Sequence, residues 1–426
     1  MSRRWPTIAL PIASLLIAAA CTQQPPEQKT PPPERRGPRA LRDVTYERSP
    51  VRRERGRYLT EGVLQCFVCH SDRDWTKPGA PPAAGRKGAG HVWEDRPWLV
   101  SPNLTPDNES GAGTWTDDMF ARAIREGIGH DGRVLHPQMW YGAFRHLSDE
   151  DLASVIVYLR SLDPVRNPLP VTKLPVDRKP LVARAPLDAP VPAPDLSTPV
   201  ARGAYLARLA DCQGCHTAWE APMNPGFFGG GNLIEIFGRP PVFSANLTPA
   251  PSGIGAYYDA TMFREVMRTG RLKGREISAA MPWVVFGNMS DEDLDALFAY
   301  FRSRHPVNHA VSNTDDPTPC PMCGQKHGLG DRNAPKIRDT VAIDPRTLAD
   351  YVGRYTFADG PMDVTTDGKT LLVRFNGGGP AVPLVLLENG EFTAAELPDY
   401  FTFRRDAHGR VDAVITNADD VGVRIQ

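Results

Sequence analysis

Two stretches of the chain place apolar residues at helical spacing behind a serine and a run of acidic residues. The serines are Ser148 and Ser290, and the apolar positions lie within 152–159 and 294–301. Asp151 and Asp293 stand three residues after each serine, in the capping-box position, so each serine is predicted to begin a helix. Another helix, ended by a glycine, is predicted earlier in each stretch, at 119–126 and at 262–269.

These helices belong to two copies of one plan. Both copies contain an opening Gly-x-Tyr-Leu, a Cys-x-x-Cys-His motif, an Asn-Leu-Thr-Pro loop, a Met-Phe pair, and a methionine ahead of the serine. The matching segments are 56–59 and 203–206, 66–70 and 212–216, 101–106 and 244–249, 118–120 and 261–263, 139–144 and 281–286, and 147–152 and 289–294. Each copy is predicted to be a small, mostly helical domain with long irregular loops.

From about residue 345 the apolar positions change to a period of two. Six strands are predicted, at 350–357, 362–366, 371–375, 382–387, 400–404 and 411–417. Asp-Gly, Asn-Gly and His-Gly pairs between them predict tight turns. We therefore expect a small antiparallel barrel or curved sheet.

The net charge of the chain excludes few classes of function, whereas its cysteines indicate specific sites. A net charge of −1 over 426 residues gives no reason to expect nucleic-acid binding. Six of the seven cysteines form three Cys-x-x-Cys pairs, and Cys21 ends an apolar stretch that follows two arginines. Residues 1–21 are predicted to be an export signal, with Cys21 as a lipidated anchor to a membrane in the periplasm; cleavage near Cys21 without a lipid is the alternative.

Two of the pairs are followed directly by histidine, which is the attachment pattern of haem c. In that pattern two thiols bond to the vinyl groups of one porphyrin, and the histidine ligates the iron. Two covalently bound haem c groups are therefore expected, and the residues that hold them are Cys66, Cys69, His70, Cys212, Cys215 and His216. Disulfides or zinc sites are alternatives, although no second Cys or His pair stands at finger-like spacing.

The second axial ligand decides between electron transfer and catalysis. Met139 and Met281 hold the same place in the repeat and precede aromatic residues, so they are the predicted sixth ligands. Met119 and Met262 fall inside predicted helices and are interpreted as core residues. The remaining candidates are Met223, Met267 and Met289, and His91, His130, His136 and His146, which have no counterparts in the second copy and are interpreted as surface or loop residues. Because His/Met ligation occupies both axial positions of the iron, it leaves no position for a substrate. The prediction is therefore electron transfer with no catalytic residue.

Cys320 and Cys323 form the third pair, and three residues separate Cys323 from His327. In an oxidising compartment a disulfide is favoured, with a small metal site or a degenerate third haem site as alternatives. A thioredoxin-like role lacks the βαβ context that it requires.

The duplicated motifs resemble the di- and tri-haem cytochrome c subunits of bacterial periplasmic dehydrogenases, such as membrane-bound alcohol and gluconate dehydrogenases. The resemblance covers about residues 50–305 and implies a carrier between a quinoprotein or flavoprotein dehydrogenase and quinone or an oxidase. This chain departs from the pattern because it lacks a third CxxCH and has an additional tail. Pro282 keeps the proline that often follows the ligand methionine in that family, whereas Trp140 replaces it. Residues 348–355 resemble the opening of the small β-domain appended to serine β-lactamase-like proteins, for which a structural or docking role is expected.

The predicted fold class is mostly α: two tandem cytochrome c domains followed by a small antiparallel β-barrel-like domain. The expected segments are a signal at 1–21, a tether at 22–48, cytochrome c domains at 49–165 and 199–310, a proline-rich linker at 166–198, a linker with the third pair at 311–343, and the β-domain at 344–426. An electron-transfer protein, or a subunit of an oxidoreductase complex, is favoured. A haem enzyme of the thiosulfate-oxidising or peroxidase type, or a haem-based redox or gas sensor, is the alternative.

Overall fold

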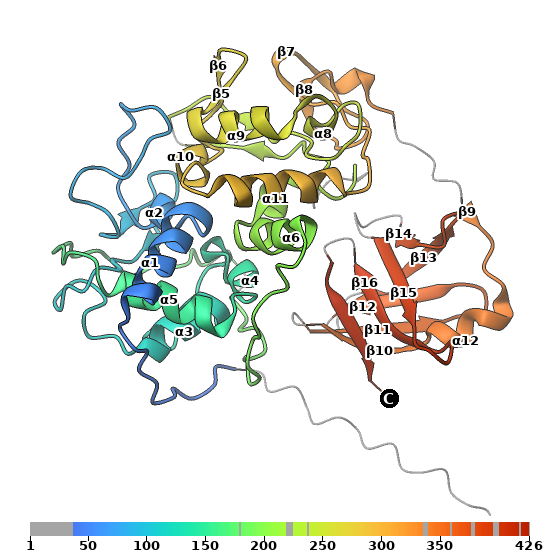
Figure 1. Ribbon diagram of the computed structural model, residues 1–426, viewed down its shortest axis with the longest axis horizontal. Helices are drawn as coiled ribbons and strands as arrows, with labels where there is room; N and C mark the ends of the chain where they lie inside the picture. Colours follow the sequence, from blue (N-terminus) through green and yellow to red (C-terminus); the bar gives the residue numbers. More distant parts are fainter. Residues whose placement is uncertain are drawn as a thin grey trace, which may run out of the picture. The chain divides into compact units, whose positions relative to one another are not determined.

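The fold is given by a computed structural model (Figure 1). It describes residues 37–178, 180–218, 225–236, 238–334, 340–357, 360–375, 380–394, 400–416 and 419–425. Within these ranges, no helix combines the length and the apolar character that crossing a membrane requires.

The first copy of the repeat is framed by helices α1 and α5, which cross in close contact. A Cβ atom added to Gly56 in α1 would lie 1.9 Å from the carbonyl oxygen of Ser154 in α5, so only glycine allows this approach. The elements of this copy are α1 (Pro50–Tyr58), the π-helical turn η1 (Leu59–Val63), α2 (Cys66–Cys69), β1 (His91–Val92), β2 (Val100–Ser101), α3 (Asp117–Glu126), η2 (Pro137–Met139), α4 (Tyr141–Phe144) and α5 (Asp149–Leu159).

The second copy repeats this crossing with helices α6 and α11. Here the added Cβ atom of Gly203 would lie 2.0 Å from the carbonyl oxygen of Ala296. The elements are α6 (Pro199–Leu209), α7 (Cys212–His216), β3 (Leu233–Ile234), β4 (Val242–Phe243), α8 (Ile254–Tyr257), α9 (Ala260–Thr269), β5 (Arg271–Leu272), β6 (Arg275–Glu276), α10 (Trp283–Phe286) and α11 (Asp291–Arg302). The internal repeat in the sequence is therefore a structural repeat.

The predicted helix ends are confirmed. The hydroxyl of Ser148 accepts a hydrogen bond from the backbone N–H of Asp151 at 3.1 Å, and Ser290 caps α11 in the same way. Helices α3 and α9 end at glycines with φ values of 67° and 65°, a left-handed conformation that favours glycine.

The two copies share one apolar core, which includes residues from α5 and η1 of the first and from α6 and α11 of the second. Gln65, just before the first haem motif, donates from its side-chain amide to the carbonyl of Ala210, just before the second, at 2.9 Å. Both residues are buried. The interface between the copies therefore runs beside the two motifs.

The C-terminal part is a closed antiparallel barrel of eight strands. The strands are β10 (Gly353–Phe357), β11 (Gly360–Thr366), β12 (Leu371–Phe375), β13 (Val382–Leu387), β14 (Phe392–Ala394), β15 (Tyr400–Arg405), β16 (Val411–Thr416) and β17 (Val421–Ile425). Their order is β12-β11-β10-β17-β16-β15-β14-β13, and pairing of β12 with β13 closes the barrel. The expected antiparallel barrel is thus present, with its own core around Tyr355, Met362 and Phe401.

Details of the barrel differ from the sequence prediction. Residues 350–351 belong to the short helix α12 (Leu348–Tyr351), and strands β14 and β17 were missed. Strand β14 has only three residues, too few to show a period. Before the barrel lie β7 (Ser312–Pro319), β8 (Lys326–Gly328), η3 (Gly330–Arg332), β9 (Thr340–Val341) and η4 (Pro345–Thr347). The segment expected to be a linker thus contains the hairpin β7–β8.

The expectation of a mostly α fold is wrong. The structure has 28% helix and 20% strand. Helices in the two copies are short, and the stretch between α2 and α3 contains a two-stranded hairpin, β1–β2, and one isolated bridge but no helix. The helical periodicity at 152–159 and 294–301 is strong but local, so it overstated the helical share of the chain.

Candidate haem-binding sites

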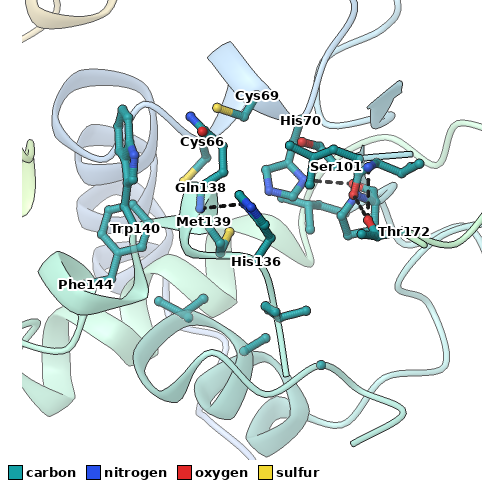
Figure 2. A pocket seen from close by; sticks show the side chains of 18 of the residues that line it. Cys66, Cys69, His70, Ser101, His136, Gln138, Met139, Trp140, Phe144 and Thr172 are labelled. Carbon is teal, nitrogen blue, oxygen red and sulfur yellow. Dashed lines mark hydrogen bonds between the residues drawn. The ribbon is translucent and has the colours of Figure 1, made fainter. Parts of the chain in front are cut away.

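A cavity in the first copy gathers the predicted haem residues (Figure 2). Cys66, Cys69, His70 and Met139 all line it, and its volume of about 330 Å³ is within the ~300–1,000 Å³ of ligand pockets. Its walls are mainly apolar and include Leu64, Leu99, Leu104, Trp115, Phe120, Phe144, Val155 and Leu159. Two thiols, an imidazole and a thioether on an apolar cavity are the donor set of a haem c, so these residues fit that group.

Each predicted proximal histidine is oriented by a backbone carbonyl. His70 Nδ1 lies 2.8 Å from the carbonyl oxygen of Pro102, and His216 Nδ1 lies 2.7 Å from that of Ala245. A carbonyl only accepts, so Nδ1 carries the hydrogen and Nε2 keeps the lone pair that binds a metal. Burial lowers the pKa of His70 to about 4 and also lowers the pKa of His216, which keeps both rings neutral.

An asparagine in each Asn-Leu-Thr-Pro loop fixes the carbonyl that orients the histidine. Asn103 accepts from the backbone N–H of Thr105 at 3.0 Å and donates to the carbonyl of Val165 at 2.7 Å. In the second copy Asn246 makes the matching bonds, to the N–H of Thr248 and, at 2.6 Å, to the carbonyl of a valine, Val307. The repeated sequence marks these loops, but their part in orienting the ligand is visible only in three dimensions.

Met139 and Met281 lie in matching turns. The N–H of Met139 donates to the carbonyl of His136 at 3.0 Å, and that of Met281 donates to the carbonyl of Ser278 at 3.0 Å. The backbone N–H of the residue before each methionine donates to the side chain three positions before that methionine. The acceptor is His136 Nδ1 in the first copy and Ser278 Oγ in the second, each at 3.2 Å. The turns diverge after the methionine, because Trp140 has a φ of 54° that Pro282 cannot adopt.

Two of the first copy's histidines, which were interpreted as surface or loop residues, lie outside helices and strands and also line the cavity. They are His130, which stacks on Trp115, and His136. His136 is thus a rival to Met139 for the iron. The matched turn favours methionine, because Ser278 performs the capping role of His136 without offering a ligand. By contrast, His91 pairs with Asp72 and Glu94, and the sulfur of Met119 accepts the backbone N–H of Thr116 at 3.4 Å.

In the second copy, Cys212, Cys215 and His216 share the short helix α7. The residue before each motif has a left-handed backbone conformation, with a φ of 56° at Gln65 and 49° at Asp211. Met281 packs against the shared core. Met223 lies outside the described residues.

The four motif thiols are not poised for thiol–disulfide exchange. Burial raises the pKa of Cys66 to about 12 and the pKa values of Cys69 and Cys215 to about 11, and it raises the pKa of Cys212 as well. Since the thiolate is the reactive form of cysteine, a thiol–disulfide role is disfavoured here.

The third pair does not form the favoured disulfide. Cys320 and Cys323 are free and buried, and they face two imidazoles, those of His309 and His327. His309 was missed because it lies 11 residues before Cys320, outside the short spacings that identify metal sites in a sequence.

The two oriented histidines, and the apolar cavity of the first copy with its two thiols and a thioether, fit the attachment pattern of haem c. No protein-family model matches the chain. It is 31% identical to the fructose dehydrogenase cytochrome subunit of Gluconobacter japonicus over 58% of this chain and 52% of that protein. It is 27% identical to the cytochrome c subunit of the quinone-type alcohol dehydrogenase of Gluconobacter oxydans over 86% of this chain and 81% of that protein. It is 30% identical to the cytochrome c subunit of the gluconate 2-dehydrogenase of Pantoea cypripedii over 59% of each chain.

The chain is therefore homologous to cytochrome c subunits of alcohol, fructose and gluconate dehydrogenases and to a dihaem cytochrome c, at modest identity over much of its length. This confirms the resemblance inferred from the motifs. The chain spans about half of the fructose dehydrogenase relative and 14% of a matching nicotinate dehydrogenase component from Pseudomonas putida. Homology to cytochromes c implies covalently bound haem c.

Proposed function

We propose that the protein is a dihaem c-type cytochrome that carries electrons from a periplasmic dehydrogenase to a respiratory acceptor. Haem attachment is proposed at Cys66 and Cys69 with His70 as ligand, and at Cys212 and Cys215 with His216. Met139 and Met281 are proposed as the sixth ligands.

The contact between Gln65 and Ala210 supports this function most directly. These residues come just before the two haem motifs, and their buried hydrogen bond of 2.9 Å makes the two attachment segments neighbours. When bound, each haem supplies an iron that changes between the ferrous and ferric states. The chain holds the two attachment points together and surrounds them with a shared apolar core that excludes water. This arrangement suits a conductor of electrons.

A closed ligand set distinguishes a carrier from an enzyme. The oriented imidazoles of His70 and His216 and the two methionines in matching turns would together supply two protein ligands to each iron, which would leave no position for a substrate. A peroxidase or a gas sensor needs such a position. The carrier is therefore preferred over both alternatives.

The proposed donor is a dehydrogenase, because the relatives are named as cytochrome subunits of fructose, alcohol and gluconate dehydrogenases. The resemblance of the motifs implies that this donor is a quinoprotein or a flavoprotein. Quinone or an oxidase is the proposed acceptor. Export through residues 1–21 and a lipid at Cys21 are part of the proposal; both lie outside the described residues. The proposed cytochrome domains are 49–165 and 199–310, and the barrel is proposed to be a structural or docking module.

Rapid mixing tests this function. The oxidised protein is mixed with the dehydrogenase subunit of a related alcohol or gluconate dehydrogenase, stripped of its own cytochrome and supplied with its substrate. We expect substrate-dependent reduction of both haems, followed by reoxidation when a quinone analogue is added. A haem that stays oxidised with every donor but reacts with peroxide would contradict the proposal.

A further inference from the structure

Four buried side chains meet beside the second copy of the repeat. In the sequence they all follow both Cys-x-x-Cys-His motifs. They are His309, Cys320, Cys323 and His327, and their ligand atoms all lie within 4.8 Å of one another. None of the four residues is more than 3% exposed. We infer that they bind one structural metal ion, and that this ion is Zn²⁺ held by two thiolates and two imidazoles.

The spacing of the ligand atoms matches a tetrahedral ion. The Sγ atom of Cys320 lies 3.4 Å from Nε2 of His309, and the Sγ atom of Cys323 lies 3.3 Å from Nε2 of His327. Zinc bonds of ~2.3 Å to sulfur and ~2.0 Å to nitrogen, at the tetrahedral angle, place sulfur and nitrogen about 3.5 Å apart. Small shifts of the side chains therefore complete the coordination.

Both histidines have the outer hydrogen bond that metal ligands use. Nδ1 of His309 donates to the carbonyl of Gly229 at 2.8 Å, and Nδ1 of His327 donates to the carbonyl of Gly328 at 3.0 Å. These bonds fix the tautomer that leaves each Nε2 lone pair facing a sulfur atom. Asn333 donates to the sulfur of Cys320 at 3.4 Å, which favours the thiolate.

The backbone around the cluster is built for close approach. Cys320 and Cys323 form the turn of the hairpin β7–β8, where Gly324 has a φ of 71° and donates its N–H to the carbonyl of Cys320 at 3.0 Å. On the opposite side, a Cβ atom at Gly231 would lie 2.6 Å from Cε1 of His309. The cluster is therefore pressed against a loop of the second cytochrome copy.

Comparison of the two copies shows what is new in the second. Asn167 in the first copy donates from Nδ2 to the carbonyl of Ala89 at 2.8 Å. His309 makes the corresponding bond to Gly229, at the same distance and two residues after the matching valine. The imidazole thus makes the same hydrogen bond to the loop as the asparagine and adds a second nitrogen that can bind a metal.

The charge of this donor set suits a buried dication. On binding, each thiol loses a proton and forms a bond to the metal, so two protons are released for each Zn²⁺ bound. Two thiolates and two neutral imidazoles then give a site with no net charge, which limits the cost of burial. Four protein ligands leave no open position, so the ion is structural and not catalytic.

The ion would fasten the hairpin β7–β8 to the loop beside the second haem site. Gly230, next to the carbonyl partner of His309, donates its N–H to the carbonyl of His216 at 2.8 Å. The metal site is thereby connected through one peptide unit to the second proximal ligand. We expect loss of the ion to loosen this part of the second copy.

Elemental analysis and X-ray absorption at the zinc edge test the inference on the full-length holoprotein. We expect one zinc and two irons per chain, with two sulfur ligands at ~2.3 Å and two nitrogen ligands at ~2.0–2.1 Å around zinc. Haem iron does not contribute at the zinc edge. A Cys320–Cys323 disulfide without bound metal, or a third haem attached at these cysteines, would overturn the inference.

A matched pair of variants adds a second test. His309→Asn installs the residue that the first copy uses at this place, so it keeps the bond to Gly229 and removes one ligand. We expect it to retain both haems, to lose at least nine-tenths of the zinc and to melt at a lower temperature. Met322→Leu, between the two cysteines, is expected to keep the zinc. Full zinc content in His309→Asn would refute the assignment of this ligand, and the absorption measurement decides the question if that variant does not fold.

Discussion

Tyr205 donates its hydroxyl hydrogen to the carboxylate of Asp151, 2.8 Å away in the other copy of the repeat. Tyr58 makes the reciprocal bond to Asp293. Each tyrosine oxygen also accepts the backbone N–H of the serine that caps the same helix, Ser148 or Ser290. The first helix of each copy thus helps to cap the last helix of its neighbour, which ties the two copies into one unit.

Replacing Tyr205 by phenylalanine should therefore destabilise the whole two-copy unit. Asp151 is buried, so the lost hydrogen bond to its carboxylate should lower the free energy of unfolding by about 1.5–3 kcal/mol. Denaturant titration followed by circular dichroism measures the loss. Tyr58→Phe serves as the symmetric comparison, and a loss below about 0.5 kcal/mol in both variants, as at an ordinary surface site, would contradict this role for the pair.

Asn246→Ala should disturb the second haem site selectively. The side chain of Asn246 donates to the carbonyls of Val307 and His309 at 2.6 and 3.0 Å, and its loss would leave the Val307 carbonyl only the longer contacts from Thr248 and Ser252. A cost of at least about 2 kcal/mol is expected, together with a changed potential of the second haem only. Redox titration measures the potentials, and Asn103→Ala should shift the first haem instead. If both haems shift equally in each variant, the loops do not act locally.

Met281→Ala should open the second iron while leaving its haem attached, because the thioether bonds remain. Without the thioether ligand the potential should fall by a sizeable part of the ~0.8 V range that axial ligands span. Carbon monoxide should then bind one haem per chain. Met262→Leu is the matched control, since Met262 lies inside α9 and should leave both haems unchanged. Met139→Ala should act likewise on the first haem; if His136→Ala does so in its place, the ligand assignment changes.

Replacing Cys212 and Cys215 together by serine should remove one of two haems. The first motif is left intact, so the pyridine haemochrome assay should fall from two haems per chain to one. The corresponding change at Cys66 and Cys69 should remove the other. Two haems in either double variant would show that the attachment sites are wrongly assigned.

Removal of residues 340–426 should leave both haem spectra intact. The barrel has a hydrophobic core of its own, separate from the core that the two copies share. Optical and circular dichroism spectra of the shortened protein measure this. If haem is no longer incorporated, the barrel is not an independent module.

The sequence predicts the local features of this fold well. Capping residues such as Ser148 and Ser290 and the haem motifs act over a few neighbouring positions, so their patterns survive in one dimension. The helical share was overestimated because periodicity identifies helices but does not measure the loops between them. Strand β14 was missed because three residues show no period.

The parts of the site that sequence could not supply depend on contacts between distant segments. Pro102 orients His70 across 32 positions, and Gly229 meets His309 across 80. No local spacing encodes such pairs. For the same reason Cys320 and Cys323 suggested a disulfide, whereas the folded chain places two histidines beside them.

Optical spectra of the purified protein, oxidised and reduced, with haem quantified and carbon monoxide added, test the central claim most directly. Two haems per chain, a sulfur-to-iron band in the oxidised protein and no response to carbon monoxide are expected for a closed His/Met electron carrier. A high-spin spectrum, or carbon monoxide bound to one haem of the unmodified protein, would show an open iron and contradict this account.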